Sequence, residues 1–329
     1  MNIINTRTGK IFTDIEKRLE WLYVGDYGKD NNIKADFLGL TKKITGVKHR
    51  DVDISDKMVV TISTQKGCPM KCNYCDVPRY GHHGNVTTNE MLWMIDHALY
   101  DSGIKSVERL NIHFARMGEP TYNRAVIEAA GILWTLHFDI HDIRDSRLPC
   151  EFTAKTVHPV VSTMMPKGNR DLESYLIDWC KLKNDVYQGE AGLQLSINST
   201  DEYQRNSQFG DTSLGLADIS NMCVMLPTPK GRKYTLNFAV TQETILNAKD
   251  LDYMFDRDNF IVKITPIHQT ANALKSGYDV TTSYDKYDVY SQFEEPLLEL
   301  GWDVIVFVPS KEEDEDKITC GNALISDSC

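Results

Sequence analysis

Short apolar runs alternate with longer segments of helical periodicity from Val59 almost to the end of the chain. Seven of these runs predict strands, at residues 59–63, 110–114, 151–153, 193–197, 234–240, 260–264 and 304–308. Strands that alternate with helices form parallel sheets, and about six such units that close partly on themselves give a βα barrel. We therefore expect an α/β fold built as a partial, TIM-like βα barrel of about six parallel strands.

The segments between these runs carry helix signals. Thr87 and Glu90 form a capping box, and Gly103 provides a stop. Between them, apolar residues share one helix face: Met91, Leu92, Ile95 and Leu99. The next helix repeats the pattern with Val126, Ala129, Ala130, Leu133 and Trp134.

Residues 1–57 precede the predicted barrel and are too few to form a separate domain in addition to a barrel lead-in. Thr13 and Glu16 have capping-box spacing, and an apolar stripe follows: Ile15, Leu19 and Leu22. We expect one amphipathic helix here. We interpret 1–57 as an N-terminal appendage and 58–329 as the core with a C-terminal extension.

Three cysteines lie in the run 67–75, directly after the first predicted strand: Cys68, Cys72 and Cys75. Thiolates at this spacing could hold three irons of a [4Fe–4S] cluster and leave the fourth iron open to a ligand. A fourth cysteine in register is absent, whereas ferredoxins and structural zinc sites use four ligands. The alternatives are a zinc knuckle or three incidental thiols. In a βα barrel this loop would lie at the carboxyl-end rim, where such barrels place their chemistry.

Composition limits the function classes. No segment of the 329-residue chain reaches the apolar length of a membrane span, the amino terminus has no secretory signal, and eight cysteines fit a reducing compartment. These features predict a soluble, cytoplasmic protein without a membrane partner. The net charge of −11 argues against tight nonspecific RNA binding. We interpret the basic run 230–233 as a solvated turn rather than a nucleic-acid patch.

The Cys-x3-Cys-x2-Cys loop, with Tyr74 before its last cysteine, resembles the radical S-adenosylmethionine (SAM) superfamily. The resemblance implies two cofactors, a [4Fe–4S] cluster and SAM, whose amino and carboxylate groups chelate the open iron. An electron from the reduced cluster then cleaves SAM into methionine and a 5′-deoxyadenosyl radical. The resemblance also implies a partner that donates the electron, such as flavodoxin or ferredoxin.

Most of the chain from Thr61 to Asp327 further resembles the RlmN/Cfr group, radical SAM enzymes that methylate carbon 2 or carbon 8 of an adenine in RNA. The matching motifs follow in order: Ser63-Thr64-Gln65, Gly81, Asn85-Val86-Thr87, Met117-Gly118-Glu119-Pro120, Ser196-Ile197-Asn198, Ile264-Thr265-Pro266-Ile267-His268 and Cys320-Gly321-Asn322.

By that resemblance Gly118 and Glu119 meet the amino group of SAM. Four more residues would line its ribose, carboxylate or adenine: Thr153, Ser196, Asn198 and His268. Each position also has an ordinary structural interpretation, such as a turn, a backbone hydrogen bond or a polar rim. The group usually has serine and asparagine where this chain has Thr153 and His268.

The same resemblance makes Cys320 a methyl carrier. It implies that Cys320 accepts a methyl group from one SAM, and that the radical made from a second SAM takes a hydrogen from it before addition to the adenine. A thiolate suits the first step, because it is a strong nucleophile once a positive neighbour lowers its pKa. The alternative is a buried structural cysteine, the role we predict for Cys150, Cys180 and Cys223.

Three features depart from the group. Thr61 stands where the group has a second cysteine that releases the product, and Asn237 stands where it has a glutamate. The helical RNA-binding domain that precedes the barrel in the group has no counterpart among residues 1–57. Cys329 could return as a substitute thiol, although a frayed terminus is the simpler interpretation.

We therefore predict a radical SAM enzyme that transfers a methyl group through Cys320 to an adenine-type or other substrate. The expected partner that carries the acceptor is an RNA or a nucleotide. One alternative is an enzyme that abstracts hydrogen directly from a peptide or nucleotide. The other is a noncatalytic Fe–S or zinc binding module.

Overall fold

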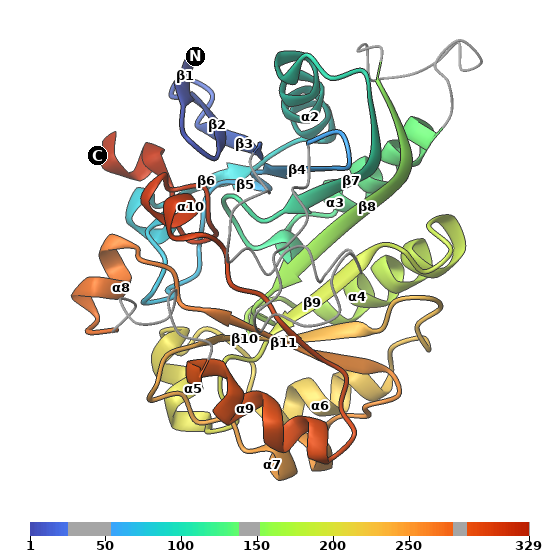
Figure 1. Cartoon of the computed structure of the whole chain (residues 1–329), viewed down its shortest axis with the longest axis vertical. Helices are drawn as coiled ribbons and strands as arrows, with labels where there is room; N and C mark the ends of the chain where they lie inside the picture. Colours follow the sequence, from blue (N-terminus) through green and yellow to red (C-terminus); the bar gives the residue numbers. More distant parts are fainter. Residues whose placement is uncertain (26–53, 138–151, 279–287, 329) are drawn as a thin grey trace.

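The computed structural model describes residues 1–25, 54–137, 152–278 and 288–328, and in this part of the chain ten strands form one sheet (Figure 1). The order is β1-β2-β3-β4-β7-β8-β9-β10-β11-β12. Neighbouring strands from β4 to β12 all pair in parallel. Their bounds are β4 (Lys57–Ile62), β7 (Ser106–Phe114), β8 (Thr153–Thr163), β9 (Gly192–Ser196), β10 (Tyr234–Val240), β11 (Phe260–Pro266) and β12 (Val304–Val306).

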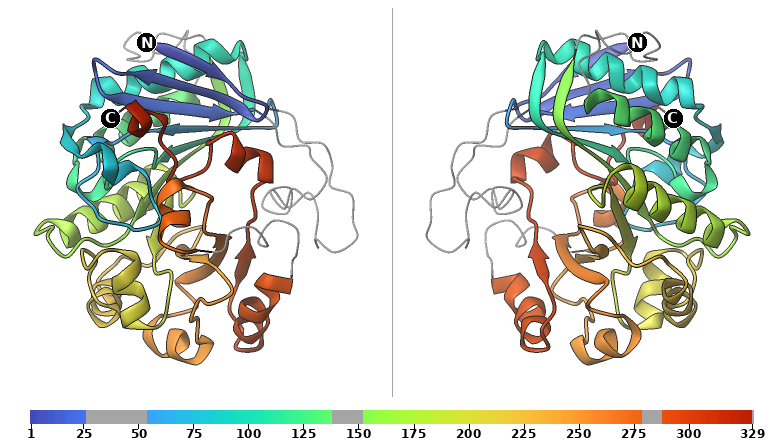
Figure 2. Two further views of the ribbon diagram at one scale, coloured as in Figure 1. Left: turned by 90° about the vertical axis from the view of Figure 1, so that its left-hand side faces the viewer. Right: turned by 90° about the vertical axis from the view of Figure 1, so that its right-hand side faces the viewer.

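The sheet curls around an interior without closing. At one edge β12 pairs with β11, and β4 pairs on its outer side with β3 rather than with β12 (Figures 1 and 2). The α/β class and the mostly parallel sheet agree with the sequence prediction. The predicted count of about six parallel strands is wrong, because the described residues contain seven, with the short strand β12 at the edge.

β8 is longer than the sequence predicted and lies further along the chain. It begins at Thr153 and continues to Thr163, whereas the prediction ended at 153. Pro159 lies inside the strand, where proline normally argues against a central position. It is tolerated because β8 pairs with β9 only from Val160 onward.

The amino-terminal residues form an antiparallel meander instead of the predicted helix: β1 (Asn2–Asn5), β2 (Gly9–Asp14) and β3 (Leu19–Val24). It extends the main sheet through β3 and β4. Every residue of β3 is buried, because Trp21 faces the main core while Leu22 packs with Ile318 of the C-terminal part. Apolar residues on both faces of one strand imitate helical spacing, which explains the wrong prediction.

Helices cover the outer face of the sheet: α2 (Thr88–Ser102), α3 (Ala125–Leu133), α4 (Leu172–Lys181), α5 (Glu202–Gln208), α6 (Leu216–Val224), α7 (Ala248–Met254) and α9 (Asp288–Glu299). Two short helices, α8 (Ala271–Lys275) and α10 (Lys311–Glu315), follow β11 and β12. The predicted capping box of α2 is confirmed: Thr87 Oγ1 accepts the N–H of Glu90 at 3.2 Å, and the Glu90 carboxylate accepts the N–H of Thr87 at 2.8 Å.

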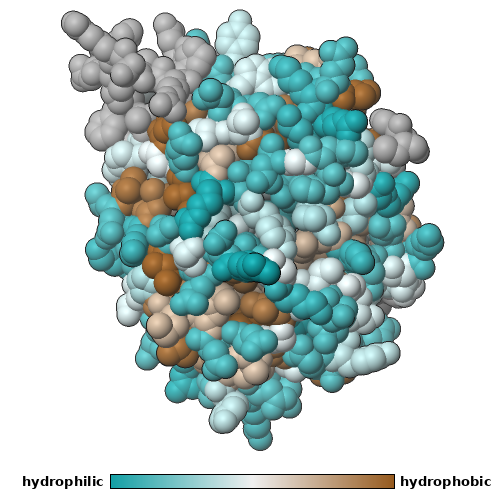
Figure 3. Space-filling view, turned by 180° about the vertical axis from the view of Figure 1, so that it is seen from behind, coloured by the Kyte–Doolittle hydropathy of each residue, from teal (hydrophilic) through white to brown (hydrophobic). Residues whose placement is uncertain are grey.

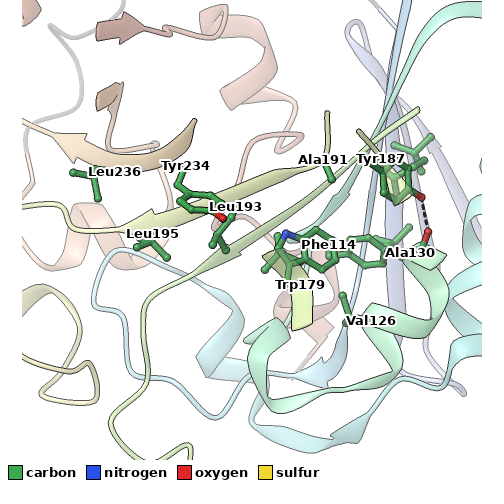
Figure 4. Close-up of a cluster of buried hydrophobic side chains, with 14 of the residues drawn as sticks. Phe114, Val126, Ala130, Trp179, Tyr187, Ala191, Leu193, Leu195, Tyr234 and Leu236 are labelled. Atoms are coloured by element: carbon green, nitrogen blue, oxygen red, sulfur yellow. Dashed lines mark hydrogen bonds between the residues drawn. The ribbon is translucent and has the colours of Figure 1, made fainter. Parts of the chain in front are cut away.

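The main core lies between these helices and the sheet (Figure 4). Trp179 of α4 packs on Phe114 of β7 and donates its indole N–H to the carbonyl of Gly192 at 3.1 Å. The Tyr187 hydroxyl donates to the carbonyl of Ala130. Cys180 and Cys223 are buried in this core, as predicted, whereas Cys150 lies outside the described residues.

The surface is mainly polar. On the face opposite to Figure 1, hydrophilic side chains predominate and hydrophobic ones form small separate areas (Figure 3). In the part of the chain that the structure describes, no helix combines the length and hydrophobicity that crossing a membrane requires.

The inner face of the sheet lines one interior cavity with both polar and apolar side chains. Alternate residues of its strands face this cavity; the polar ones include Thr61, Asn111, His113, Ser162, Gln194, Ser196, Thr235, Asn237 and Lys263, and the apolar ones include Val59, Val160, Ala239, Ile261 and Ile305. Closed βα barrels usually fill this space with branched apolar side chains. The interior of this open barrel instead leaves a cavity suited to a ligand with both polar and apolar parts.

Loss of the α2 capping box should destabilise the protein. We expect Thr87→Ala to lower the free energy of unfolding by about 1 kcal/mol, because the N–H of Glu90 loses its acceptor. Urea unfolding measures the difference. The control is Tyr100→Ala on the same helix, whose side chain is 79% exposed and which should change stability by less than about 0.5 kcal/mol. Equal effects of the two substitutions would contradict the assignment.

Candidate functional site

The three cysteines lie in a loop that begins after β5 (Gln65–Gly67) and is closed by β6 (His82–Asn85). Gly67 has a φ of 86°, and a Cβ at this position would lie 1.9 Å from the carbonyl oxygen of Gly81. Only glycine allows this approach. The N–H of Cys68 donates to the same carbonyl at 2.9 Å. All three cysteines line one cavity of about 340 Å³ in the open barrel.

The chemistry of these thiols fits an iron–sulfur cluster. Burial raises the pKa of Cys68 to about 12, and burial together with the neighbouring thiols raises the pKa of Cys72 and Cys75. Buried thiolates need a positive partner, and iron provides one. Within the described ranges, no three His, Cys, Asp or Glu side chains come close enough to coordinate a single metal ion. A [4Fe–4S] cluster instead binds each cysteine through a separate iron.

The segment after β11 fixes the backbone of this loop. Thr270 Oγ1 donates to the carbonyl of Tyr74 at 2.7 Å, and the side-chain amide of Asn272 donates to the carbonyl of Cys75 at 2.6 Å. In return, the carboxylate of Asp76 accepts the N–H of Asn272 at 2.8 Å. The start of α8 and the cysteine loop are thereby held as one unit.

Gly118 and Glu119 follow β7 at the edge of the cavity. Gly118 has a φ of 104°, and a Cβ there would lie 2.6 Å from the Cβ of Gln65. The Glu119 carboxylate accepts from Thr121 Oγ1 at 2.7 Å and from the N–H of Met164 at 3.1 Å. Burial raises the pKa of Glu119 in spite of these hydrogen bonds. They fix the orientation of a buried carboxylate that borders the cavity.

Three further predicted residues line the same cavity: Ser196, Asn198 and His268. Ser196 is the last residue of β9. Asn198 has a φ of 62°, and its side-chain oxygen accepts the N–H of Ala239 at 3.1 Å. His268 Nδ1 lies 3.5 Å from Asp314 Oδ1.

Thr153 is not brought to this site, which corrects the sequence prediction. It is the first residue of β8 and pairs with Ser106 at the amino-terminal end of the sheet. The cavity is lined by Val160 and Ser162 near the other end of β8, and by Met164 directly after the strand. The error follows from the misplaced strand, and Ser162 is the polar side chain that β8 contributes.

Cys320 follows α10 and lines the same cavity as the cysteine loop. Its side chain is exposed and contributes to the wall of this cavity inside the open barrel. Burial raises the pKa of Cys320, while the positive charges of Lys263 and Arg116 act to lower it. The residue after Cys320 contacts the cysteine loop, because the N–H of Asp76 donates to the carbonyl of Gly321 at 2.8 Å and a Cβ at Gly321 would lie 3.8 Å from Cα of Cys75.

A buried ion pair holds the Cys320 segment. Arg116 Nη2 lies 2.5 Å from Oε1 of Glu20 on β3, and the two side chains are 1% and 0% exposed. The Glu20 carboxylate also accepts the N–H of Ile325 at 2.8 Å. Arg116 Nη1 donates to the carbonyl of Thr319 at 3.3 Å. The pair therefore contacts the chain on both sides of Cys320.

Sequence reasoning missed Glu20, Arg116, Asp76, Thr270 and Asn272. One signal was available for Glu20, because it is the only charged residue in the apolar run Leu19–Val24. A charged side chain within a buried run usually has a specific partner. The others act on segments that are distant in sequence, and no local pattern marks them.

The two single-residue departures from the RlmN/Cfr pattern also lie at this cavity. Thr61 of β4 and Asn237 of β10 both line it. The Asn237 Oδ1 atom is buried and has no hydrogen-bond partner among the described residues. Cys329 lies outside the described residues.

Comparison with known proteins supports the resemblance found in the sequence. No family model matches the chain. A probable dual-specificity RNA methyltransferase RlmN of Heliobacterium modesticaldum is 23% identical over 231 residues, which cover 68% of this chain and 54% of that protein. The corresponding protein of Thermotoga sp. strain RQ2 is 23% identical over 235 residues, covering 67% of this chain and 58% of the relative. The chain thus matches little more than half the length of these relatives.

A similar solved structure is a radical SAM methyltransferase from Sphaerobacter thermophilus. The TM-score is 0.62 at 16% sequence identity, and the match covers 99% of this chain and 80% of that one. The likeness shows that the two proteins share a fold. The sequence resemblance to RlmN-type radical SAM proteins is confirmed by the curated relatives.

Removal of one partner of the Glu20–Arg116 pair should destabilise the protein strongly. We expect Glu20→Gln to lower the free energy of unfolding by about 3–5 kcal/mol, because it leaves the Arg116 charge buried without its counter-ion. Adding Arg116→Met should recover part of this loss. Urea unfolding measures the free energies, and reaction with a thiol reagent should show faster labelling of Cys320 in Glu20→Gln.

The control is Glu108→Gln, which removes an exposed ion pair with Lys155, 2.7 Å long between side chains that are 63% and 72% exposed. Its effect should stay below about 1 kcal/mol. If Glu20→Gln were as mild as this control, the pair would not hold the Cys320 segment.

Proposed function

We propose that this chain is a radical SAM enzyme of the RlmN type, which binds a [4Fe–4S] cluster and SAM and transfers a methyl group through Cys320. One observation carries the proposal: a single cavity is lined by the three cysteines of the loop, by Gly118 and Glu119, and by Cys320. The curated RlmN relatives support the same assignment. A noncatalytic binding module would not need Glu119 and Cys320 at the same cavity as the loop.

Cys68, Cys72 and Cys75 would hold the cluster, and Gly118, Glu119, Ser196, Asn198 and His268 would hold SAM. When bound and reduced, the cluster supplies the electron that cleaves SAM into methionine and a 5′-deoxyadenosyl radical. The buried Glu119 carboxylate is a fixed acceptor for an ammonium group, because Thr121 and Met164 already orient it. Asn198 is fixed in the same way by Ala239.

Cys320 would carry the methyl group. The Cys320 thiol would lose its proton and its sulfur would bond to the methyl carbon, while the bond between that carbon and the SAM sulfur breaks and S-adenosylhomocysteine is released. Lys263 and Arg116 favour the thiolate that this step needs, since both lower the pKa of Cys320 against the effect of burial. The open surface of Cys320 toward the cavity makes the sulfur accessible.

An adenine-type acceptor in an RNA or a nucleotide is the substrate class that the RlmN relatives suggest, and a flavodoxin or ferredoxin would supply the electron. An oxygen-sensitive cluster also suits a cytoplasmic location. Thr61 favours a second reaction, the direct abstraction of hydrogen from a substrate, because no thiol is present where the RlmN group has its product-releasing cysteine. Methylation of Cys320 separates the two reactions.

The loop cysteines should be required for the cluster. We expect anaerobic reconstitution with iron and sulfide to give about four irons per chain, and Cys68→Ala, Cys72→Ala or Cys75→Ala to abolish the charge-transfer absorbance. Cys223→Ala is the matched control, since this cysteine is buried in the core and should leave iron content unchanged. A cluster that survives Cys72→Ala would refute the assignment.

SAM should be cleaved and Cys320 methylated. We expect the reduced, reconstituted protein to form 5′-deoxyadenosine and a Cys320 peptide heavier by one methyl group, both measured by mass spectrometry. Glu119→Ala should weaken SAM binding more than it changes the cluster spectrum, because the carboxylate contacts SAM and not iron. An unmodified Cys320 during active SAM cleavage would overturn methyl transfer and favour hydrogen abstraction.

A further inference from the structure

A fully buried arginine on α5 has no part in the chemistry proposed so far. Arg205 is 0% exposed. Burial lowers the pKa of its guanidinium to about 10, so the group keeps its positive charge near neutral pH. Because an arginine is almost never fully buried unless it is paired, this side chain is expected to have a specific negative partner.

The hydrogen bonds of this guanidinium go to neutral acceptors. Nη1 donates to the carbonyls of Ser196 and Ile197 at 2.7 and 2.6 Å. Nη2 donates to the carbonyl of Met164 at 3.3 Å and to Oγ of Ser213, and Nε donates to the carbonyl of Leu214 at 3.4 Å. These contacts satisfy the donors but bring no negative charge.

Among the residues that the structure describes, no carboxylate forms an ion pair with Arg205. Glu202 is the carboxylate whose charge acts on Arg205, but its side chain is exposed and already accepts the N–H of Leu216 at 2.9 Å. A buried charge without a counter-ion destabilises a fold. A negative group other than these side chains is therefore expected near α5.

The helix that carries Arg205 is attached to the cysteine loop. Asn73 follows Cys72 directly, and its N–H donates to the carbonyl of Gln208 at 2.9 Å. The side-chain amide of Asn73 donates to the carbonyl of Ser207 at 3.0 Å. Ser207 and Gln208 are the last two residues of α5, and Arg205 lies less than one turn before them.

The ring of Phe209 connects the guanidinium with the cysteines. Arg205 Cζ lies 4.6 Å from the centroid of this ring, which is a cation–π distance. The same ring belongs to an apolar cluster against which Cys68 and Cys72 pack. Met164, whose carbonyl accepts from Arg205, is a member of this cluster. One layer of apolar side chains thus lies between the guanidinium and these two cysteines.

We propose that the iron–sulfur cluster is the counter-ion of Arg205, and that the buried positive charge raises the reduction potential of the cluster. A [4Fe–4S] cluster held by thiolates is negatively charged, and each electron that it accepts increases this charge. A positive group nearby in a low-dielectric interior therefore favours the reduced form. The inference rests on the proposed function for the presence of the cluster. Its readout, a reduction potential, does not require SAM cleavage.

The test is an anaerobic redox titration of the reconstituted full-length protein with dithionite, followed by electron paramagnetic resonance. We expect Arg205→Gln to lower the ratio of reduced to oxidised cluster at a fixed potential about tenfold, which is about 59 mV for one electron. Arg205→Lys keeps the charge but cannot reproduce the planar set of hydrogen bonds. It should therefore retain most of the wild-type potential, while iron analysis verifies that each variant holds a cluster.

A second pair of variants leaves Arg205 in place. Ser213→Asp introduces a carboxylate beside the guanidinium, because Ser213 Oγ accepts from Nη2. The new ion pair neutralises the buried charge, so the potential should fall in the same direction as in Arg205→Gln. Ser213→Asn is the matched control of similar size without a charge, and it should keep the wild-type potential.

The surface control is Arg257→Gln. Arg257 Nη1 lies 3.2 Å from Asp252 Oδ1, and its side chain is 48% exposed, so solvent screens its charge. Its loss should leave the potential of the cluster unchanged.

Three outcomes would count against these assignments in different ways. Wild-type potentials in Arg205→Gln and Ser213→Asp, or an equal shift in Arg205→Lys and Arg205→Gln, would overturn the electrostatic role of Arg205, and continued SAM cleavage would leave the proposed function intact. The expected shifts without any SAM cleavage would refute the proposed function alone. A wild-type protein that binds no cluster would refute both.

Discussion

The buried ion pair between Glu20 and Arg116 is the contact on which the arrangement of the cavity most depends. It joins β3 to the end of β7 and, through Thr319 and Ile325, to the segment that carries Cys320. A buried ion pair adds little stability over apolar residues of similar size, but separating its two partners destabilises the fold because one charge stays buried without its counter-ion. We infer that the pair selects one arrangement of the C-terminal segment, in which Cys320 faces the cysteine loop. The amino-terminal meander is in this sense part of the site.

The cavity inside the barrel follows from the open sheet. A closed barrel can fill its centre with branched side chains, whereas a sheet that does not close leaves space that water or a ligand occupies. Polar side chains such as Ser162 and Asn237 line this space on the inner face, and the main apolar core lies in the outer layer between sheet and helices.

Local signals were sufficient for part of this picture. The capping box of Thr87 and Glu90 involves residues three positions apart, and the cysteine spacing is set within one loop. The meander was missed because both faces of β3 are buried, which requires knowledge of what packs on each side. The prediction that Thr153 lines the site failed for a related reason, since the length of β8 depends on its pairing with β7 and β9.

The residue at position 61 bears on which reaction the cavity performs. In the RlmN-type reaction a second thiol must displace the product from the methyl-carrying cysteine. A hydroxyl is a poor substitute for it, because a hydroxyl attacks sulfur far less readily than a thiolate does. Thr61 occupies that position and lines the cavity. Among the cavity-lining residues that the structure describes, the cysteines are Cys320 and the three in the loop, which would be engaged by iron. Release of a product bound to Cys320 therefore needs a thiol from beyond these residues, whereas direct hydrogen abstraction needs none. The difference between the two reactions lies in the missing sulfur nucleophile, and the residues proposed to hold SAM serve both.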